Sequence, residues 1–299
     1  MANARALDKR RKSIRNIRKI TRTMELIATA RYKKAMDRAA AATAYTDQIT
    51  KIVKQLADAG TDVQHPLLEQ RDNINSSRVL VLASNRGLCG GYNASILRTA
   101  MPHIRSLNEE MESVSIDASG KRGVNGLKFR GIDADQQFLQ FEDQPAYAEV
   151  EKIAEAYLKQ YITGQIDRLD VVYTKFISTS KQIAVVETLL PIGSLADESD
   201  DAVDDSVGAG NAHSQYEFLP SAESILEEVV PTSFKVKLFK CFLDAAVSEQ
   251  VARMIAMKGA TESAGDMIKQ LSMTYNRARQ SQITGEIMEI IGGVEALEG

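Results

Sequence analysis

The sequence has few cysteines and histidines and no long apolar run. Its 299 residues include two cysteines, Cys89 and Cys241, which lie far apart, and three histidines that are equally scattered. This spacing indicates neither a disulfide framework nor a metal site. Apolar runs such as residues 79–83 are far shorter than the ~20 residues of a membrane span. With 44% hydrophobic and 26% charged residues, we expect a folded, non-secreted protein on the reducing, cytosolic side of a membrane.

Charge of one sign is concentrated at the N-terminus. Residues 1–40 contain thirteen Lys and Arg against three acidic residues, a local net charge of +10, whereas the whole chain carries −3. The other 259 residues therefore carry −13. Charge so segregated indicates a surface for an acidic partner, which the sequence leaves open as nucleic acid, lipid or protein.

The first 59 residues contain no glycine and no proline, so nothing interrupts a helix of roughly 80 Å. A helix this long needs an equally long partner. Its heptad seam is expected to read Ile14, Ile17, Thr21, Met24, Ala28, Arg31, Ala35, Arg38, Ala42, Tyr45, Ile49, Ile52 and Leu56. Two positions are basic: Arg31 and Arg38 either extend along the seam with their guanidinium groups in water or bind a specific anion.

The C-terminal third has no proline after Pro231, and we predict a second long helix with Thr232 or Ser233 as its N-cap. Its seam is expected to read Val247, Gln250, Met254, Met257, Thr261, Ala264, Ile268, Leu271, Tyr275 and Ala278, and then Ile283, Ile287, Ile290 and Val294. Small residues on both seams allow close approach. We infer an antiparallel coiled coil of the two chain ends.

Between these helices the pattern changes to short apolar runs with turns. Strands are predicted at 78–84, 113–119, 170–178 and 182–191, with helices at 93–111 and 147–163. Strands that alternate with helices indicate an α/β sheet with crossover connections. The acidic segment 197–211 is expected to be a solvated loop.

Two glycine-rich segments follow predicted strands, "SNRGLCGGYN" at 84–93 and "SGKRGVNG" at 119–126. Neither has the spacing of a phosphate loop or a dinucleotide-binding motif. We predict tight strand-to-helix turns in which glycine supplies positive φ, with a phosphate nest as the alternative. Since no catalytic triad stands out either, the sequence does not favour an enzyme.

Three segments resemble a known family. They are "RRKSIRNIRKITRTMELIATAR" at 10–31, "NRGLCGGYN" at 85–93 and "SEQVARMIAMKGATESAGDMIKQLSMTYNRARQSQITGEIMEIIGG" at 248–293. Together they are similar to the gamma subunit of F-type ATP synthases, the central rotor shaft, over the whole chain. The resemblance agrees with an α/β fold class: a long antiparallel coiled coil of N- and C-terminal helices and a central, Rossmann-like α/β domain. The expected divisions are 1–59, 60–220 and 221–299.

The resemblance implies a non-catalytic subunit without cofactor or metal. Its partners would be the alpha and beta subunits of a catalytic ring, the epsilon subunit and the membrane-embedded c-ring. The α/β domain would form the foot of the shaft. A flow of protons or sodium ions would turn this foot, and the shaft would drive the three catalytic sites in turn through binding, synthesis and release. The expected location is the cytoplasmic side of a bacterial plasma membrane.

The resemblance also implies contact residues. Those expected to meet the alpha/beta ring are Lys19, Arg22, Met24, Arg253, Gln280, Thr284 and Glu286. Lys19, Arg22 and Met24 would face an acidic lever segment of beta. Residues 277–284 would push the catalytic subunits, and the apolar residues 287–293 would slide in an apolar collar.

The sequence departs from the family pattern at two places. Asn85 stands where the family commonly has Asp, and Leu219-Pro220 stands where it has Glu-Pro. Glu217, two residues before that pair, is the expected foot contact in its place.

Two alternative functions are weighed against the shaft. One is a nucleic-acid-binding coiled coil that uses the basic first helix, although the rest of the chain is acidic. The other is a nucleotide-dependent enzyme built on the central domain, which would retain nucleotide on purification.

Overall fold

A computed structural model describes residues 4–58, 66–67, 71, 74–141, 144–192 and 222–298. The acidic segment 197–211 and Glu217 lie outside these residues. The helices are α1 (Ala4–Asp58), α2 (Tyr92–Glu110), α3 (Lys121–Lys128), α4 (Tyr147–Ile162) and α5 (Ala222–Glu298). The strands are β1 (Ser76–Leu82), β2 (Ser113–Ser119), β3 (Gln136–Phe138), β4 (Arg168–Ser178) and β5 (Lys181–Leu190).

The chain divides into two compact units. The terminal unit joins Met1–Ala30 to Arg253–Gly299, and the central unit is Arg31–Ala252. Both long helices pass from one unit to the other, since α1 and α5 each have residues in both. The predicted α/β fold with two long terminal helices is confirmed.

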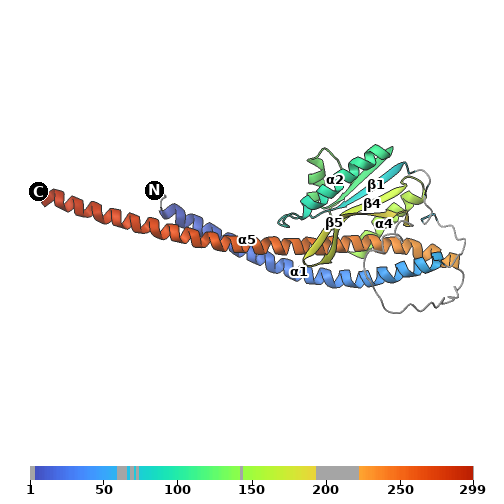
Figure 1. Ribbon diagram of the computed structural model, residues 1–299, viewed down its shortest axis with the longest axis horizontal. Coiled ribbons are helices and arrows are strands. Elements are labelled where there is room, and N and C mark those ends of the chain that lie inside the picture. The colour runs from blue at the N-terminus through green and yellow to red at the C-terminus, as the bar shows by residue number, and fades with distance from the viewer. Residues whose placement is uncertain are drawn as a thin grey trace. The chain divides into compact units, whose positions relative to one another are not determined.

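The central unit is built on one five-stranded sheet with strand order β3-β2-β1-β4-β5 (Figure 1). Strands β3, β2, β1 and β4 are parallel, and β5 returns antiparallel to β4. The four predicted strands and both predicted helices are present. Helix α2 follows β1 and helix α4 precedes β4, as crossover connections between parallel strands require.

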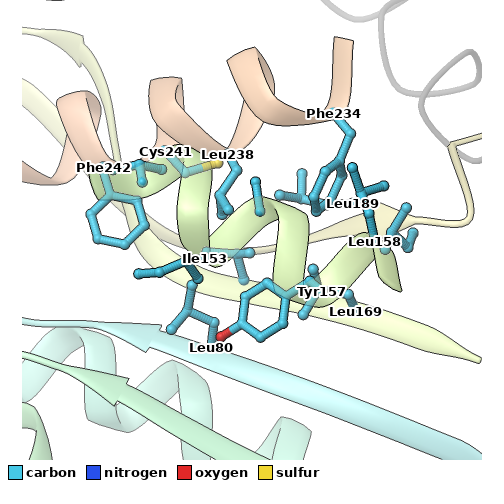
Figure 2. Packing of buried hydrophobic residues seen from close by; sticks show 14 of the residues in the cluster. Leu80, Ile153, Tyr157, Leu158, Leu169, Leu189, Phe234, Leu238, Cys241 and Phe242 are labelled. Atoms are coloured by element: carbon cyan, nitrogen blue, oxygen red, sulfur yellow. The ribbon is translucent and has the colours of Figure 1, made fainter. Parts of the chain in front are cut away.

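Both faces of the sheet are buried. Along β1, Val79 and Val81 pack with α2 and α3, whereas Leu80 and Leu82 pack with α4 and the first part of α5. Figure 2 shows the second of these cores, in which Phe234 and Leu238 of α5 approach residues of α4 and the sheet. Alternate strand residues point to opposite faces, so helices on both sides account for the continuous apolar run in β1.

Helix α3 and strand β3 were not predicted. Glycines at 123 and 126 lower helix propensity, and they lie inside α3 because neighbouring atoms leave no room for a side chain. A Cβ on Gly123 would come within 2.9 Å of Ala83 Cβ, and one on Gly126 within 2.3 Å of Leu97 Cδ1. Only the first glycine of the segment, Gly120, has the predicted positive φ, at 89°.

Helix α5 begins at Ala222, so the predicted N-cap at Thr232 or Ser233 is wrong. Pro231 lies inside the helix. Thr232 Oγ1 donates a hydrogen bond of 2.8 Å to Glu228 O of the preceding turn. Val230 and Phe234, on either side of the proline, are buried in the core, and this packing outweighs the backbone hydrogen bond that proline lacks.

The α1 seam is half as predicted. The first heptad positions are buried at Thr21, Ala28, Ala35 and Ile49. The second positions are not: Ile17, Met24, Arg38 and Tyr45 are exposed. Buried residues lie one place later, at Glu25, Ala39 and Thr46. The seam alternates steps of four and three residues where three and four were expected, so Arg38 does not lie in it.

The α5 seam is largely as predicted as far as Ala278. Met257 and Ala264 are buried, and Thr261, Ile268, Leu271, Tyr275 and Ala278 are half-buried. From 279 to 294 every residue is exposed. The apolar end of this helix therefore has no partner among the described residues.

Candidate functional site

The basic part of α1 in the terminal unit forms one wall of a groove. The groove is lined by Lys12, Arg15, Asn16, Arg18, Lys19, Arg22 and Thr23 of α1 and by Thr261 and Ile268 of α5. Five of these nine residues are cationic. The cations at i, i+3 and i+4 project from one side of the helix, which gives the groove a strongly positive wall.

The two acidic residues of α1 in this unit are both paired. Asp8 accepts from Arg11 at 2.6 Å and lies 3.0 Å from Lys12. Lys12 first, and then Arg11, lower the pKa of the Asp8 carboxyl. Glu25 Oε1 accepts from Arg22 Nη1 at 2.7 Å. The other groove cations keep their positive charge available to an anionic partner.

The structure brings two of the three predicted α1 contacts together. Lys19 and Arg22 line the groove, and Met24 is exposed. Lys19 has no ion pair within the described residues, whereas Arg22 is engaged by Glu25. The i, i+3 spacing of Arg22 and Glu25 on a predicted helix was the signal for that pairing, but the expected seam did not include Glu25.

Gln280 and Thr284 occupy one face near the end of α5. Thr284 Oγ1 donates to Gln280 O at 2.9 Å, one turn earlier. Glu286 lies on a different side of the helix and accepts from Gln282 Nε2 at 2.9 Å. Apolar residues follow, and all of these are exposed: Ile287, Met288, Ile290, Ile291 and Val294. The predicted sequence of polar and then apolar surface is present on α5.

Arg253 differs from the other predicted contacts. It is only 7% exposed, and it precedes Gln280 by 27 residues, about 40 Å along a helix. The structure does not bring it together with the residues near the end of α5.

In the glycine-rich turns of the central unit, side chains of the turns themselves accept hydrogen bonds from backbone N–H groups. Asn85 Oδ1 accepts from Lys121 N, the first residue of α3, at 3.0 Å. Asn93 Oδ1 accepts from Ser84 N at 3.0 Å. Gly120 is required in its turn, since a Cβ there would lie 2.1 Å from Ala83 O. These contacts favour the tight-turn interpretation over a phosphate nest.

Three buried polar clusters could not be found from the sequence. In the first, the completely buried Asp117 accepts from Arg78 at 3.0 Å and from Tyr157 at 2.7 Å. Burial raises the pKa of Asp117, against the effect of both partners.

In the second cluster, Asp170 binds His103 at 2.8 Å, together with Arg168 and Thr188. Burial alone would raise the pKa of Asp170, but the bond to His103, the bond from Thr188 and the charge of Arg168 lower it. In the third, Tyr173 donates to Glu187 at 2.5 Å and Lys237 lies 3.2 Å from the same carboxylate. All three clusters cross-link strands and helices.

Within the described ranges, no group of His, Cys, Asp and Glu has an arrangement that could hold a metal ion. Cys89 and Cys241 are both buried free thiols. Of the helices that the structure describes, none is long and apolar enough to cross a membrane.

The comparisons with known proteins agree along the whole chain. A family model described as ATP synthase matches residues 3–297. The ATP synthase gamma chain of Rhodopirellula baltica is 85% identical, with all of both chains covered. That of Frankia casuarinae is 38% identical over 97% of this chain and 96% of the relative.

A solved structure of the Euglena gracilis mitochondrial ATP synthase, containing OSCP, F1 and the c-ring, includes a chain with the same fold. Its TM-score is 0.64 at 19% sequence identity, with 98% of this chain and 94% of that chain covered. Sequence and fold lead to one assignment: this chain belongs to the ATP synthase gamma-chain family.

Proposed function

We infer that this protein is the central rotary shaft of an F-type ATP synthase. It couples ion-driven rotation of the c-ring to the conformational cycle of the catalytic alpha/beta ring. The observation that carries the inference is the end of α5, where a 16-residue stretch, 279–294, is wholly exposed and changes from polar to apolar. An isolated soluble protein rarely exposes such an apolar stretch, whereas a partner surface requires one.

We propose that the chain contributes no catalytic group. The buried polar groups of the central unit form hydrogen bonds with one another that link strands and helices. In its glycine-rich turns, side chains of the turns bond backbone N–H groups. The alternative of a nucleic-acid-binding coiled coil gains no support, because the family assignment accounts for the whole chain, including its basic helix. We place the protein at the cytoplasmic side of a bacterial plasma membrane, attached through the complex.

On α1, we propose that Lys19, Arg22 and Met24 meet an acidic segment of the beta subunit. The positive groove wall supports this choice of partner. Lys19 contributes charge directly, whereas Arg22 must share its guanidinium with Glu25. Exposed ion pairs contribute only about 0–1 kcal/mol each, so the attraction is distributed and does not act as a brake.

On α5, we propose that Gln280, Thr284 and Glu286 push the catalytic subunits and that the apolar residues beyond them slide in an apolar collar. Arg253 is proposed as a further contact of the same ring, at a different height of the helix. Its burial indicates that a partner reaches only the edge of its side chain.

The foot is proposed to lie in the region 60–220, where the epsilon subunit and the c-ring bind, between coiled-coil segments 1–59 and 221–299. Glu217 is retained as the proposed c-ring contact. The family's Glu-Pro pair supports an acidic contact near this position, and Glu217 itself lies outside the described residues.

The proposal is tested by co-expressing alpha and beta subunits of the same organism with the full chain, with a chain ending at Tyr275, or with no third subunit. Sustained ATP hydrolysis and co-purification are expected with the full chain and are expected to weaken on truncation. A full chain that neither joins the ring nor changes turnover would overturn the proposal.

Alanine variants test the contacts. Gln280→Ala with Thr284→Ala is expected to lower hydrolysis several-fold, whereas Thr274→Ala, an exposed change on the same helix, serves as the matched control. Lys19→Ala is expected to weaken the coupling between the shaft and the catalytic ring without changing the melting temperature of the chain. Equal effects of the pair and of the control would contradict the assigned pushing face.

A further inference from the structure

The coiled coil of the terminal unit has a polar layer inside its seam. Thr21 and Glu25 of α1 are each only 9% exposed, and Thr21 faces Thr261 of α5. The hydroxyl oxygens of the two threonines lie 2.8 Å apart. Each hydroxyl also lies within hydrogen-bond distance of its own helix, at Arg18 O or Met257 O. One hydroxyl can therefore donate across the seam while the other donates to its own helix.

Glu25 is the more demanding member of this layer. Its Oε1 accepts from Arg22, whereas its Oε2 is buried without a hydrogen-bond partner. A buried carboxylate with an unsatisfied oxygen costs stability relative to an apolar residue. In coiled coils, polar residues placed at such seam positions specify register in exchange for stability.

The rest of the α1 seam is poorly suited to fix a register. Small residues occupy much of it, with Ala28, Ala35 and Ala39 as its most buried members. A seam of alanines repeats its shape every seven residues, so a slip of one heptad would bury similar surface. Helix α5 is fixed to the sheet by Phe234, Leu238 and their neighbours. Helix α1 also contacts the central unit through Tyr32, whose ring centroid lies 6.4 Å from that of Phe176 on β4 and whose hydroxyl lies 3.2 Å from Thr179 Oγ1. Within the terminal unit, the alignment of α1 along α5 depends on the seam residues themselves.

A slip of one heptad would separate the two threonines. Thr21 would face Met254 or Ile268 in place of Thr261, and Thr261 would face Ile14 or Ala28. Ile14, Ala28 and Ile268 can neither accept nor donate a hydrogen bond, and the Met254 thioether is only a weak acceptor. A second contact shares the observed alignment, because the Arg11 guanidinium lies 4.6 Å from the centre of the Tyr275 ring.

We propose that Thr21 and Thr261 form a register lock that sets the axial position of α1 against α5, with Glu25 as a second buried polar residue of the α1 seam and Arg22, on the same helix, as its counter-ion. The lock matters for a shaft, because contact residues on the two helices must keep a fixed relative height. The proposal concerns the chain alone and does not rest on the proposed function.

The experiment measures register directly in the full chain. Spin labels are placed at two exposed positions of the terminal unit, Ile20→Cys on α1 and Ile255→Cys on α5, and their distance distribution is recorded by pulsed EPR. Since Cys89 and Cys241 are buried, the parent chain without new cysteines gives the background labelling. A single narrow distribution is expected for the labelled parent.

Two variants remove the lock: Thr21→Val with Thr261→Val, and the same pair with Glu25→Leu. The expected result is a second distance, because a slip of seven residues moves one label by about 10 Å along the axis. The matched control is Thr23→Val with Thr274→Val, which removes two exposed hydroxyls that bond only to their own helices.

A second distance in the lock variants and not in the control supports the proposal. A single, unchanged distribution in the lock variants overturns it, as does a second distance that appears equally in the control. Should the triple variant not fold, the double valine variant decides, because valine matches threonine in shape.

Discussion

Asp244 of α5 offers the sharpest test of how the central unit is held together. It is 5% exposed, and burial raises its pKa from 3.8 to about 6. The charged groups around it are Lys240 on its own helix, Glu187 of β5 and Lys175 of β4. The two lysines oppose the rise, whereas Glu187 adds to it. The folded state therefore disfavours the ionised carboxylate of Asp244.

The sign of the stability effect follows from this rise. Because the folded-state pKa lies above the ordinary value, the folded protein binds more protons than the unfolded chain between about pH 4 and pH 6, and stability from this group falls as pH rises through that window. A rise of about 2 pKa units corresponds to about 3 kcal/mol at pH 8, as an upper value. Asp244→Asn removes the charge and is expected to recover most of this lost stability.

The assay is urea unfolding of the full chain at pH 8 and pH 4, with and without Asp244→Asn. The variant is expected to be more stable by up to about 3 kcal/mol at pH 8 and by less than about 1 kcal/mol at pH 4. Asp266→Asn, the same change at an exposed position of α5, is the control and is expected to be neutral at both values. A variant that is equally stable as the parent at pH 8, or less stable, would refute the reasoning.

Three further predictions concern the central unit and are measured by the same unfolding assay. Asn85→Asp replaces an amide that donates to Leu139 O and Phe141 O with an acceptor, and a loss of about 2–3 kcal/mol is expected; no loss would show that these bonds are not formed. Tyr157→Phe removes the hydroxyl that donates to buried Asp117 and is expected to cost about 1.5–3 kcal/mol, whereas an unchanged midpoint would contradict the contact. Leu80→Ala empties a completely buried position of the core in Figure 2 and is expected to cost about 2–5 kcal/mol; a cost below about 1 kcal/mol would contradict that packing.

Much of the architecture could be predicted because its signals are local. The absence of glycine and proline from residues 1–59 predicted α1, and the apolar run at 113–119 predicted β2 with its observed bounds. Helix α3 was missed because its two glycines, Gly123 and Gly126, argue locally against a helix. They are needed because Ala83 and Leu97 come too close for a side chain, and no local pattern reveals that contact. Pro231 led to a wrong prediction of where α5 begins. Its neighbours Val230 and Phe234 are held by tertiary packing, which a local pattern does not show either.

The candidate site was predictable in outline only. The family resemblance supplied its residues, and the helical periodicity supplied the change from polar to apolar surface near the end of α5. The heptad pattern of α1 did not decide whether the second seam position falls three or four residues after the first. Met24 and Glu25 are adjacent, and the choice between them moves the whole second row of the seam by one residue. The expected seam therefore missed that Glu25 is buried and that it engages Arg22. The partners of Asp117 are up to 40 residues away in sequence, so only the fold shows them.

We expect this chain to turn inside a catalytic ring, and rotation can be observed directly. The ring of alpha and beta subunits is fixed to a surface, and a bead is attached to an exposed residue of the central unit such as Phe129→Cys. On addition of ATP, we expect unidirectional rotation in three steps per turn, one for each catalytic site. A bead that only fluctuates about one position while the same complexes hydrolyse ATP would contradict it.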